Sequence, residues 1–259
     1  MRNKTSWTAA CIGLAFSLGV ADAGKPRANA TDWPRNVVRV KTGIFEYRDS
    51  NRGKKVGSST ITIQRLAGSG NLSFINKAEF SDGSSGFQSQ RWEAVATPEF
   101  RPILAKLAFL HGDEVVPVFE VRYGFGRATG FLVSRKSSPQ RIKQTIDALV
   151  PEDIVDQRID WAAILASDLE TGGNIEFNVF DPSSGVSRVT AEVGPSEELR
   201  VPAGTFSAVR VDYQIEKLGR TERYRLFVAR NLPHMMLRED FSNGVVAELV
   251  RVRESDPRR

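Results

Sequence analysis

The chain has 259 residues, a formal net charge of +5 and one cysteine, Cys11. Its 36 Lys and Arg residues are interspersed with 31 Asp and Glu residues, as in IEKLGRTERYR. The sequence contains no block of basic residues of the kind that would follow a nucleic-acid phosphate backbone. These features argue against a nucleic-acid-binding protein and exclude a disulfide within the chain. Weak attraction to an anionic membrane surface stays open.

The first residues are typical of a secretory signal peptide over 1–23. A positive start precedes a mostly apolar run at 8–20 and the small-x-small motif ADA, so we expect cleavage between Ala23 and Gly24. The apolar run is too short for a membrane-spanning helix, which needs about 20 residues. We therefore expect export to the periplasm and no transmembrane span after cleavage.

The remaining chain is long enough for one large core. We expect a flexible leader over 24–36, a single β-rich domain over 37–253 and a disordered tail over 254–259. Apolar residues alternate with polar residues from Val37 onward, and this period of two predicts half-buried antiparallel strands. The predicted strands include the ranges 37–47, 59–66, 72–80 and 86–96, with a reversal at Asp82-Gly83.

The segment 106–134 predicts three more strands, turned at His111-Gly112-Asp113 and near Gly126. Pro117 interrupts the second of them. Because proline donates no ladder hydrogen bond, we expect this strand to be an edge or to carry a bulge.

The period changes within PEDIVDQRIDWAAILASDLETGG. Apolar residues fall three to four apart from Val155 to Leu169, and Gly172-Gly173 ends the pattern. This spacing predicts one helix near residues 155–170 with one apolar stripe to bury. The acids before and within it, Glu152, Asp153, Asp156 and Asp160, are interpreted as complements to the positive end of the helix.

Period two returns after residue 173 and continues to residue 252. Pro202 and Gly204 mark one corner, Gly219 reverses the chain, and Asn243-Gly244 is a hairpin signal. The fold class we predict is mainly β: a curved antiparallel sheet, a half-barrel or open barrel meander, with one covering helix near residues 155–170.

This succession resembles DUF3108, a family of secreted bacterial proteins of unknown function. The resemblance rests on GIFEY at 43–47, VGSSTITI, DWAAILASDL before TGGNIEFNVFD, LRVPAGTFSAVRVDY, YRLFVARNLPHMMLRED and NGVVAELV. Of these, VPAGTF-x-AVRV is the most specific. The chain departs from the family where a serine and an arginine flank the helix motif, since Ala163 and Asp168 stand near those places. The resemblance implies a curved, predominantly β fold and no particular activity.

Candidate catalytic and metal sites are scarce. The chain has only two histidines, His111 and His234, and no Gly-x-Ser-x-Gly motif, so a serine hydrolase is not indicated. Two distant histidines supply no common zinc ligand set. Neighbouring acids such as Glu239 and Asp240 point to opposite faces of a strand, although distant carboxylates could still converge. We expect no catalysis, no metal and no cofactor.

The aromatic content suggests a ligand hypothesis. A strongly curved sheet needs its concave side filled by a helix, by side chains or by a bound molecule. We expect an apolar or amphipathic envelope molecule between the sheet and the helix, lined by Trp92, Phe119, Tyr123 and Trp161. Ordinary core packing is the alternative for each of these side chains.

Three functions therefore stay open. The first is a periplasmic, non-catalytic protein that binds or carries a hydrophobic cell-envelope component. The second is an envelope interaction or structural module that recognises a protein partner through strand edges. The third is an enzyme acting on envelope polysaccharides.

Overall fold

The computed structural model describes residues 36–81, 89–112, 114–135 and 141–254. The signal peptide, its cleavage site, most of the leader and the tail, and the reversal at Asp82-Gly83 lie outside these ranges. The strands are β1 (Gly43–Asn51), β2 (Lys54–Arg65), β3 (Leu72–Phe80), β4 (Ser89–Ala96), β5 (Pro102–His111), β6 (Glu114–Gly124), β7 (Arg127–Arg135), β8 (Arg141–Leu149), β9 (Ile154–Asp156), β10 (Asn174–Asp181), β11 (Gly185–Val201), β12 (Gly204–Lys217), β13 (Arg220–Ala229), β14 (Met236–Asp240) and β15 (Val245–Arg253). Two short 3-10 helices, η1 (Val37–Arg39) and η2 (Gln157–Ile159), and the helix α1 (Asp160–Leu165) complete the fold.

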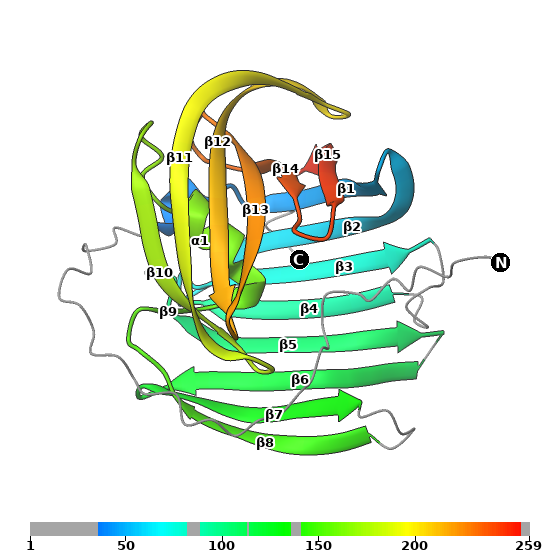
Figure 1. Ribbon diagram of the computed structural model, residues 1–259, viewed down its shortest axis with the longest axis vertical. Coiled ribbons are helices and arrows are strands. Elements are labelled where there is room, and N and C mark those ends of the chain that lie inside the picture. The colour runs from blue at the N-terminus through cyan, green and yellow to red at the C-terminus, as the bar shows by residue number, and fades with distance from the viewer. Residues whose placement is uncertain (1–35, 82–88, 113, 136–140, 255–259) are drawn as a thin grey trace.

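All these strands form one sheet, in the order β8-β7-β6-β5-β4-β3-β2-β1-β15-β14-β13-β12-β11-β10-β9. Every neighbouring pair is antiparallel except β9 and β10, which are parallel. Figure 1 shows β1–β8 as a broad layer that β10–β13 cross, with α1 between them. The sheet bends until β9 contacts β5, but it does not close into a barrel. The predicted fold class, a curved open antiparallel sheet, is confirmed.

Buried and partly exposed residues alternate along the strands, as the period of two in the sequence predicts. On β12, Val211, Tyr213 and Ile215 are buried, whereas the residues between them are partly exposed. The reversal at Gly219 joins β12 to β13, and the turn containing Gly244 joins β14 to β15. The corner at Pro202 is the β11–β12 turn, which Gly204 completes with a φ of +136°.

Pro117 lies within β6, an interior strand that pairs with β5 and β7. The β5–β6 register shifts between Leu107 and Ala108, and Ala108 pairs with Pro117. Of the two predicted outcomes, an edge or a bulge, the bulge is the one observed.

The predicted helix over 155–170 is wrong in length. Residues Ile154–Asp156 form β9, the next three form η2, and α1 has only six residues, Asp160–Leu165. Asp156 is extended and its carboxylate accepts a hydrogen bond from the Arg158 N–H, which begins the 3-10 turn rather than an α-helix. The apolar spacing from Val155 to Ile159 therefore arises from a strand and a 3-10 turn.

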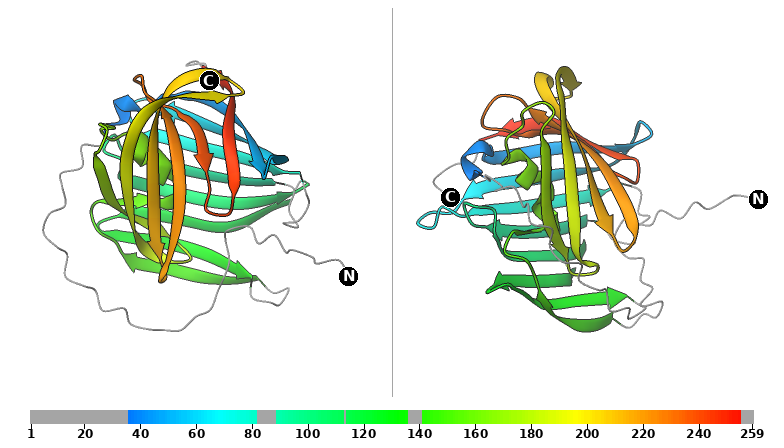
Figure 2. Two further views of the ribbon diagram at one scale, coloured as in Figure 1. Left: turned by 45° about the horizontal axis from the view of Figure 1, so that its top comes forward. Right: turned by 60° about the vertical axis from the view of Figure 1, so that its left-hand side comes forward.

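The helix α1 lies at the centre of the molecule, and both views in Figure 2 show it between the two layers. All six of its residues are buried, so it has no solvated face beside the single apolar stripe we predicted. The large core cluster joins Phe45 and Phe74 of the first layer to Val211 and Leu226 of the second. A smaller cluster around Phe119 extends toward β7 and β8.

Gly130 on β7 provides a test of the β6–β7 register. A Cβ atom there would lie 2.0 Å from the Glu120 carbonyl oxygen, and the φ of Gly130 is +155°. We expect Gly130→Ala to destabilise the protein by about 2 kcal/mol, because the backbone of Glu120 must move to make room for the new methyl group. The control is Gly124→Ala on β6, where nothing lies within 4 Å of the new Cβ. Urea unfolding of both variants checks this, and equal midpoints would contradict it.

Candidate functional site

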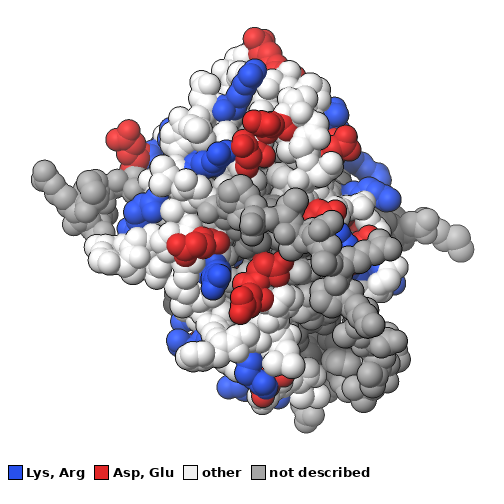
Figure 3. Space-filling model, turned by 90° about the vertical axis from the view of Figure 1, so that its left-hand side faces the viewer, with Lys and Arg blue, Asp and Glu red and all other residues white. Residues whose placement is uncertain are grey.

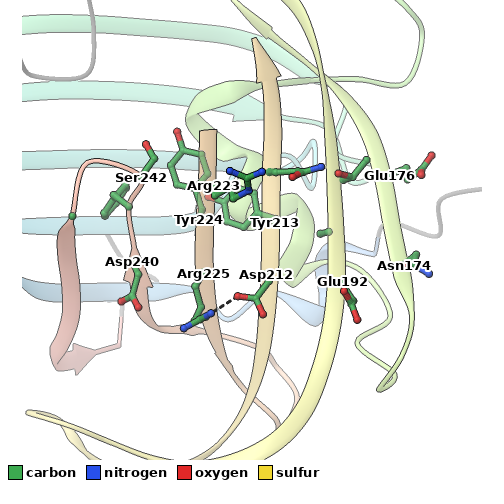
Figure 4. A pocket seen from close by; sticks show the side chains of 15 residues that line it. Asn174, Glu176, Glu192, Asp212, Tyr213, Arg223, Tyr224, Arg225, Asp240 and Ser242 are labelled. Atoms are coloured by element: carbon green, nitrogen blue, oxygen red, sulfur yellow. Dashed lines mark hydrogen bonds and ion pairs between the residues drawn. The ribbon is translucent and has the colours of Figure 1, made fainter. Parts of the chain in front are cut away.

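An open groove of about 720 Å³ crosses strands β10–β14. This volume falls within the usual range for small-molecule sites, about 300–1,000 Å³. Figure 4 shows the lining side chains spread across neighbouring strands. The lining residues are Asn174, Glu176, Thr190, Ala191, Glu192, Asp212, Tyr213, Gln214, Arg223, Tyr224, Arg225, Asp240, Phe241, Ser242 and Gly244.

Two rows of polar side chains follow from the strand register. Glu176, Thr190, Gln214 and Arg223 occupy successive paired positions from β10 to β13. The second row likewise runs from β10 to β14 and consists of Asn174, Glu192, Asp212, Arg225 and Asp240. These positions alternate with buried residues of the core, so both rows lie on the outward face of the sheet.

Most charges along the rows are already neutralised. Arg188 pairs with Glu176, Arg225 donates to Asp212 at 2.6 Å, and Arg238 donates to Asp240 at 2.6 Å. Glu192 and Arg223 have no ion-pair partner among the described residues. The groove therefore presents a nearly neutral surface with amide, hydroxyl, carboxylate and guanidinium groups available.

An aromatic cluster forms the other end of the groove. Tyr213 and Tyr224 stack with ring centroids 4.8 Å apart, and Phe241 meets Tyr224 edge-on at 6.3 Å. Tyr224 and Phe241 are only partly buried. The pairing of β13 with β14 ends at Arg225 and Asp240, so these rings lie where the sheet opens. Tyr213 and Tyr224 alternate with the polar rows along β12 and β13, so their rings belong to the inner face of the sheet, and the groove meets them where β13 and β14 part. One end of the groove is thus polar and the other is aromatic.

Two buried acids lie behind the tyrosines. The Tyr213 hydroxyl donates to Glu239 at 2.6 Å, and burial raises the pKa of Glu239 to about 8, with the negative charge of Asp160 adding to the effect. Burial also raises the pKa of Asp160 to about 7, against the opposing Trp161 N–H hydrogen bond. Acids with raised pKa values are candidates for proton transfer. Neither acid, however, is among the described residues that line the groove.

The four predicted ligand-lining residues lie elsewhere, around α1. Trp92 on β4 is partly buried and packs against both core clusters. Trp161 in α1 donates its indole N–H to the Arg158 carbonyl oxygen at 3.1 Å. Phe119 on β6 lies under the Arg158 guanidinium, 4.7 Å from ring centroid to Cζ. The Tyr123 hydroxyl donates to Asp156 at 2.5 Å. Their role in ligand binding stays a prediction.

A buried ion network connects β6, η2 and β10, and three of these aromatic residues contact it: Phe119, Tyr123 and Trp161. Arg158 donates through Nε to Asp156 at 2.7 Å and through Nη1 to Asp181 at 2.7 Å. Burial alone would raise the pKa of Asp181, but Arg158 and Lys217 hold it well below its ordinary value. This network fastens the last strands of the sheet onto β6, which is a structural role.

Neither histidine enters the groove. His234 is buried, and its Nδ1 lies 2.9 Å from the Ala229 carbonyl oxygen, while burial lowers its pKa. His111 lies exposed at the end of β5. Within the part of the chain that the structure describes, no group of three or more His, Cys, Asp or Glu side chains could hold a metal ion.

The surface charges are mixed, as the sequence indicates. Figure 3 shows basic and acidic side chains interspersed on the face it presents. No helix in the described ranges combines the length and apolar character needed to cross a bilayer.

The comparison with known proteins decides the family. A family model described as a protein of unknown function, DUF3108, matches residues 39–250. The chain belongs to the DUF3108 family. The resemblance drawn from the sequence motifs is thereby confirmed. At the two positions where the sequence analysis expects a departure from the family pattern, Ala163 is buried in α1 and Asp168 pairs with Arg39 at 3.2 Å.

One solved structure supports the fold of this DUF3108 protein. The chain is similar to a β-barrel-like DUF1849 protein from Brucella abortus, at a TM-score of 0.53 and 12% identity over 85% of this chain and 100% of the other. A Bacteroides fragilis protein with a YmcC-like fold, predicted to be exported, matches at a TM-score of 0.36 and 11% identity, over 83% and 97% of the two chains. The likeness to the DUF1849 protein concerns the fold alone. No curated protein matches.

The groove is the part of the site that the sequence analysis missed. Its two polar rows are outward positions of β10–β14, which in sequence are typical of an ordinary solvated strand face. The available signal was the presence of Asn174, Thr190 and Gln214 among the charges, which is weak because such residues are common on exposed strands.

Proposed function

We propose that this DUF3108 protein is exported to the periplasm and binds an amphipathic cell-envelope molecule in the groove across β10–β14, without catalysing a reaction. The observation that carries the proposal is the change in character along the groove. Its walls pass from paired charges, amides and hydroxyls on β10–β12 to the Tyr224 and Phe241 rings at β13 and β14. The secretory signal peptide predicted over 1–23 supports the location.

The ligand we propose has a neutral or zwitterionic polar part and a short apolar part. Gln214, Thr190 and Asn174 can both donate and accept hydrogen bonds, which suits hydroxyl or amide groups. Glu176, Asp212 and Asp240 already have arginine partners, and the two charges without one, Glu192 and Arg223, are of opposite sign, so a head group with a strong net charge is less favourable. The partly buried Phe241 ring lines the groove and supplies apolar surface for a chain or ring.

The space between sheet and helix is less suited to a ligand. Every residue of α1 is buried, and Phe74 packs edge-on against Trp161 at 6.2 Å. A guest there would have to displace packed side chains, and overfilling a close-packed core typically costs about 1–3 kcal/mol. The groove needs no such displacement.

We propose that the protein does not catalyse a reaction because its two buried acids with raised pKa values do not reach the groove. Glu239 and Asp160, whose raised pKa values suit proton transfer, lie behind Tyr213 instead of along the groove walls. A general acid must reach its substrate within hydrogen-bond distance.

Calorimetric titration with dodecyl maltoside below its critical micelle concentration tests the proposal, with maltose and laurate as partial ligands. We expect dodecyl maltoside to bind more tightly than either part. We expect Gln214→Ala and Phe241→Ala each to weaken binding about 3- to 10-fold, the effect of losing roughly 1 kcal/mol of hydrogen bonding or apolar contact.

The matched control is Gln64→Ala, which removes a partly buried glutamine from β2 in the other layer. It should leave the affinity unchanged. Failure of dodecyl maltoside to bind, or equal weakening by Gln64→Ala, contradicts binding in this groove.

A further inference from the structure

The strand β13 is paired along its whole length on one side only. Its pairing with β12 runs from Arg220 to Ala229, whereas its pairing with β14 covers only Arg225 to Val228. After Asp240 the chain turns toward β15 instead of following β13. Natural sheet edges are commonly blocked by a proline or a bulge, and residues 220–224 contain neither. The beginning of β13 is therefore an open edge within the described part of the chain.

The main-chain groups of this edge point away from β12 at alternate residues. The two-residue turn at 218–219 has φ values of +47° and +76°, so Lys217 and Arg220 close it as a hydrogen-bonded pair. Because hydrogen-bonded and non-hydrogen-bonded pairs alternate along antiparallel strands, Thr221 and Arg223 direct their N–H and C=O groups to the open side. Neither has a main-chain partner there among the described residues. Two donors and two acceptors are thus available to an added strand.

The open edge borders the aromatic end of the groove. Arg223 and Tyr224 line the groove from β13, and Phe241 and Ser242 line it from the turn after β14. Figure 4 shows Tyr224 and Ser242 on the two sides of this opening. Tyr224 and Phe241 are only partly buried. An extended segment that lay along the edge of β13 would therefore contact both unpaired main-chain groups and apolar surface.

We propose that β13 binds an extended peptide segment of another protein, antiparallel to its edge at residues 221–224. The peptide takes the place along β13 that β14 leaves after Asp240, and its main chain pairs with Thr221 and Arg223. In strand addition of this kind, main-chain hydrogen bonds give the affinity and alternate side chains give the specificity. Peptide binding is additional to the proposed function, and it does not depend on it.

The register assigns a side-chain pattern to the peptide. The peptide residue opposite Tyr224 points inward, toward the Tyr224 and Phe241 rings, and is apolar. The next residue lies opposite Arg223 on the outward face. Arg223 is exposed and has no ion-pair partner in the described ranges, so an acid there completes a cross-strand pair of opposite charge. The peptide therefore carries an apolar residue followed directly by an acidic one.

The capped peptide acetyl-Phe-Asp-Ser-Thr-amide tests the pairing by titration of the ¹⁵N-labelled protein. Methylation of the Asp nitrogen removes the N–H that faces Arg223 and should weaken binding about 10-fold. The matched control is methylation of the Ser nitrogen, whose N–H points away from β13, and this should change the affinity by about 2-fold at most. Equal weakening by the two methylations, or no binding of the unmethylated peptide at millimolar concentration, overturns the proposal.

Thr221→Pro removes a donor from the protein side of the pairing. Proline is tolerated on an edge strand where its missing N–H would face outward, so the pairing of β13 with β12 should survive. We expect Thr221→Pro to weaken peptide binding about 10-fold. Thr221→Val keeps the N–H and should bind within about 2-fold of the wild type. Equal affinities of the two variants contradict main-chain pairing.

Charge exchange tests the position of the acid. Arg223→Glu should weaken binding of the Asp peptide about 5-fold, because like charges then lie opposite each other. A peptide with Lys in place of Asp should show the reverse preference, binding Arg223→Glu more tightly than the wild type. An unchanged preference for Asp in Arg223→Glu would place the acid elsewhere and overturn the register.

Two further measurements separate this proposal from other occupants. Analytical ultracentrifugation of the wild type without peptide should show a monomer, and a dimer that Thr221→Pro abolishes would assign the edge to a second copy and overturn peptide binding. Dodecyl maltoside makes no main-chain pairing, so Thr221→Pro should leave its affinity unchanged. Peptide binding that Thr221→Pro weakens supports the pairing whether or not dodecyl maltoside binds, so the two proposals fail separately.

Discussion

Replacing Arg158 with methionine is expected to cost about 3–5 kcal/mol of unfolding free energy. The side chain of Arg158 is only 11% exposed, and it neutralises Asp156 and Asp181, which are 0% and 9% exposed. Methionine keeps much of the volume and removes the charge, so Asp156 stays buried without its ion-pair partner and Asp181 keeps only the charge of Lys217. Urea unfolding followed by far-UV circular dichroism measures the loss.

Arg188→Met is the matched control for this prediction. Arg188 pairs with Glu176 at the surface, where the two side chains are 55% and 50% exposed, and such pairs contribute about 0–1 kcal/mol. Adding Asp156→Asn and Asp181→Asn to Arg158→Met should recover part of the loss, because the unpaired charges are removed. If Arg158→Met unfolded at the same urea concentration as Arg188→Met, the network would not fasten the sheet.

The second large effect is a dependence of stability on pH that originates at Glu239. Glu239 is only 4% exposed, and burial raises its pKa to about 8 from an ordinary value of 4.5. An acid whose pKa is higher in the folded state binds its proton more tightly there. Its contribution is therefore complete below pH 4.5 and is lost as the pH rises through about 8.

Glu239→Gln should remove most of this dependence, because glutamine keeps a hydrogen-bond acceptor for Tyr213 and never ionises. Between pH 5 and pH 9 the wild type is expected to lose on the order of 4 kcal/mol more stability than the variant. Chemical denaturation at several pH values measures the difference. Asp240→Asn, one residue away on the outward face, is the control, and parallel curves for wild type and Glu239→Gln would refute the assignment.

Much of the fold could be predicted because one face of each strand is buried. The alternation on β12 and the turns at Gly219 and Gly244 depend on neighbouring residues alone, and these local rules held. The bulge at Pro117 could also be predicted as one of two outcomes, because proline has no N–H to donate to the hydrogen-bond ladder between strands.

The helix and the polar network could not be predicted from periodicity. Nearly all residues of 154–165 are buried, including Asp156 and Asp160, so strand, 3-10 turn and α-helix give similar patterns in sequence. Asp156 was interpreted as a helix-end acid, whereas it pairs with Arg158 inside the molecule. The strand and the 3-10 turn form here because β9 pairs in parallel with β10 and because Asp156 accepts a hydrogen bond from Tyr123. Both partners lie on strands that are distant in sequence.

The groove was beyond sequence analysis for a related reason. Its two rows consist of residues on β10–β14 that come together only through strand register. The aromatic end depends on the point at which β13 and β14 part. The aromatic residues chosen from the sequence, such as Trp161 and Phe119, were selected for size, and large aromatic side chains also serve in cores.

The most direct test of the proposed binding site is a titration of the ¹⁵N-labelled protein with dodecyl maltoside, followed by amide chemical-shift changes. Binding in the groove predicts the largest changes at Thr190, Gln214, Arg223 and Ser242, with small changes in α1. Changes confined to α1 and β4, or an unchanged spectrum at saturating ligand below the micelle concentration, would contradict the account.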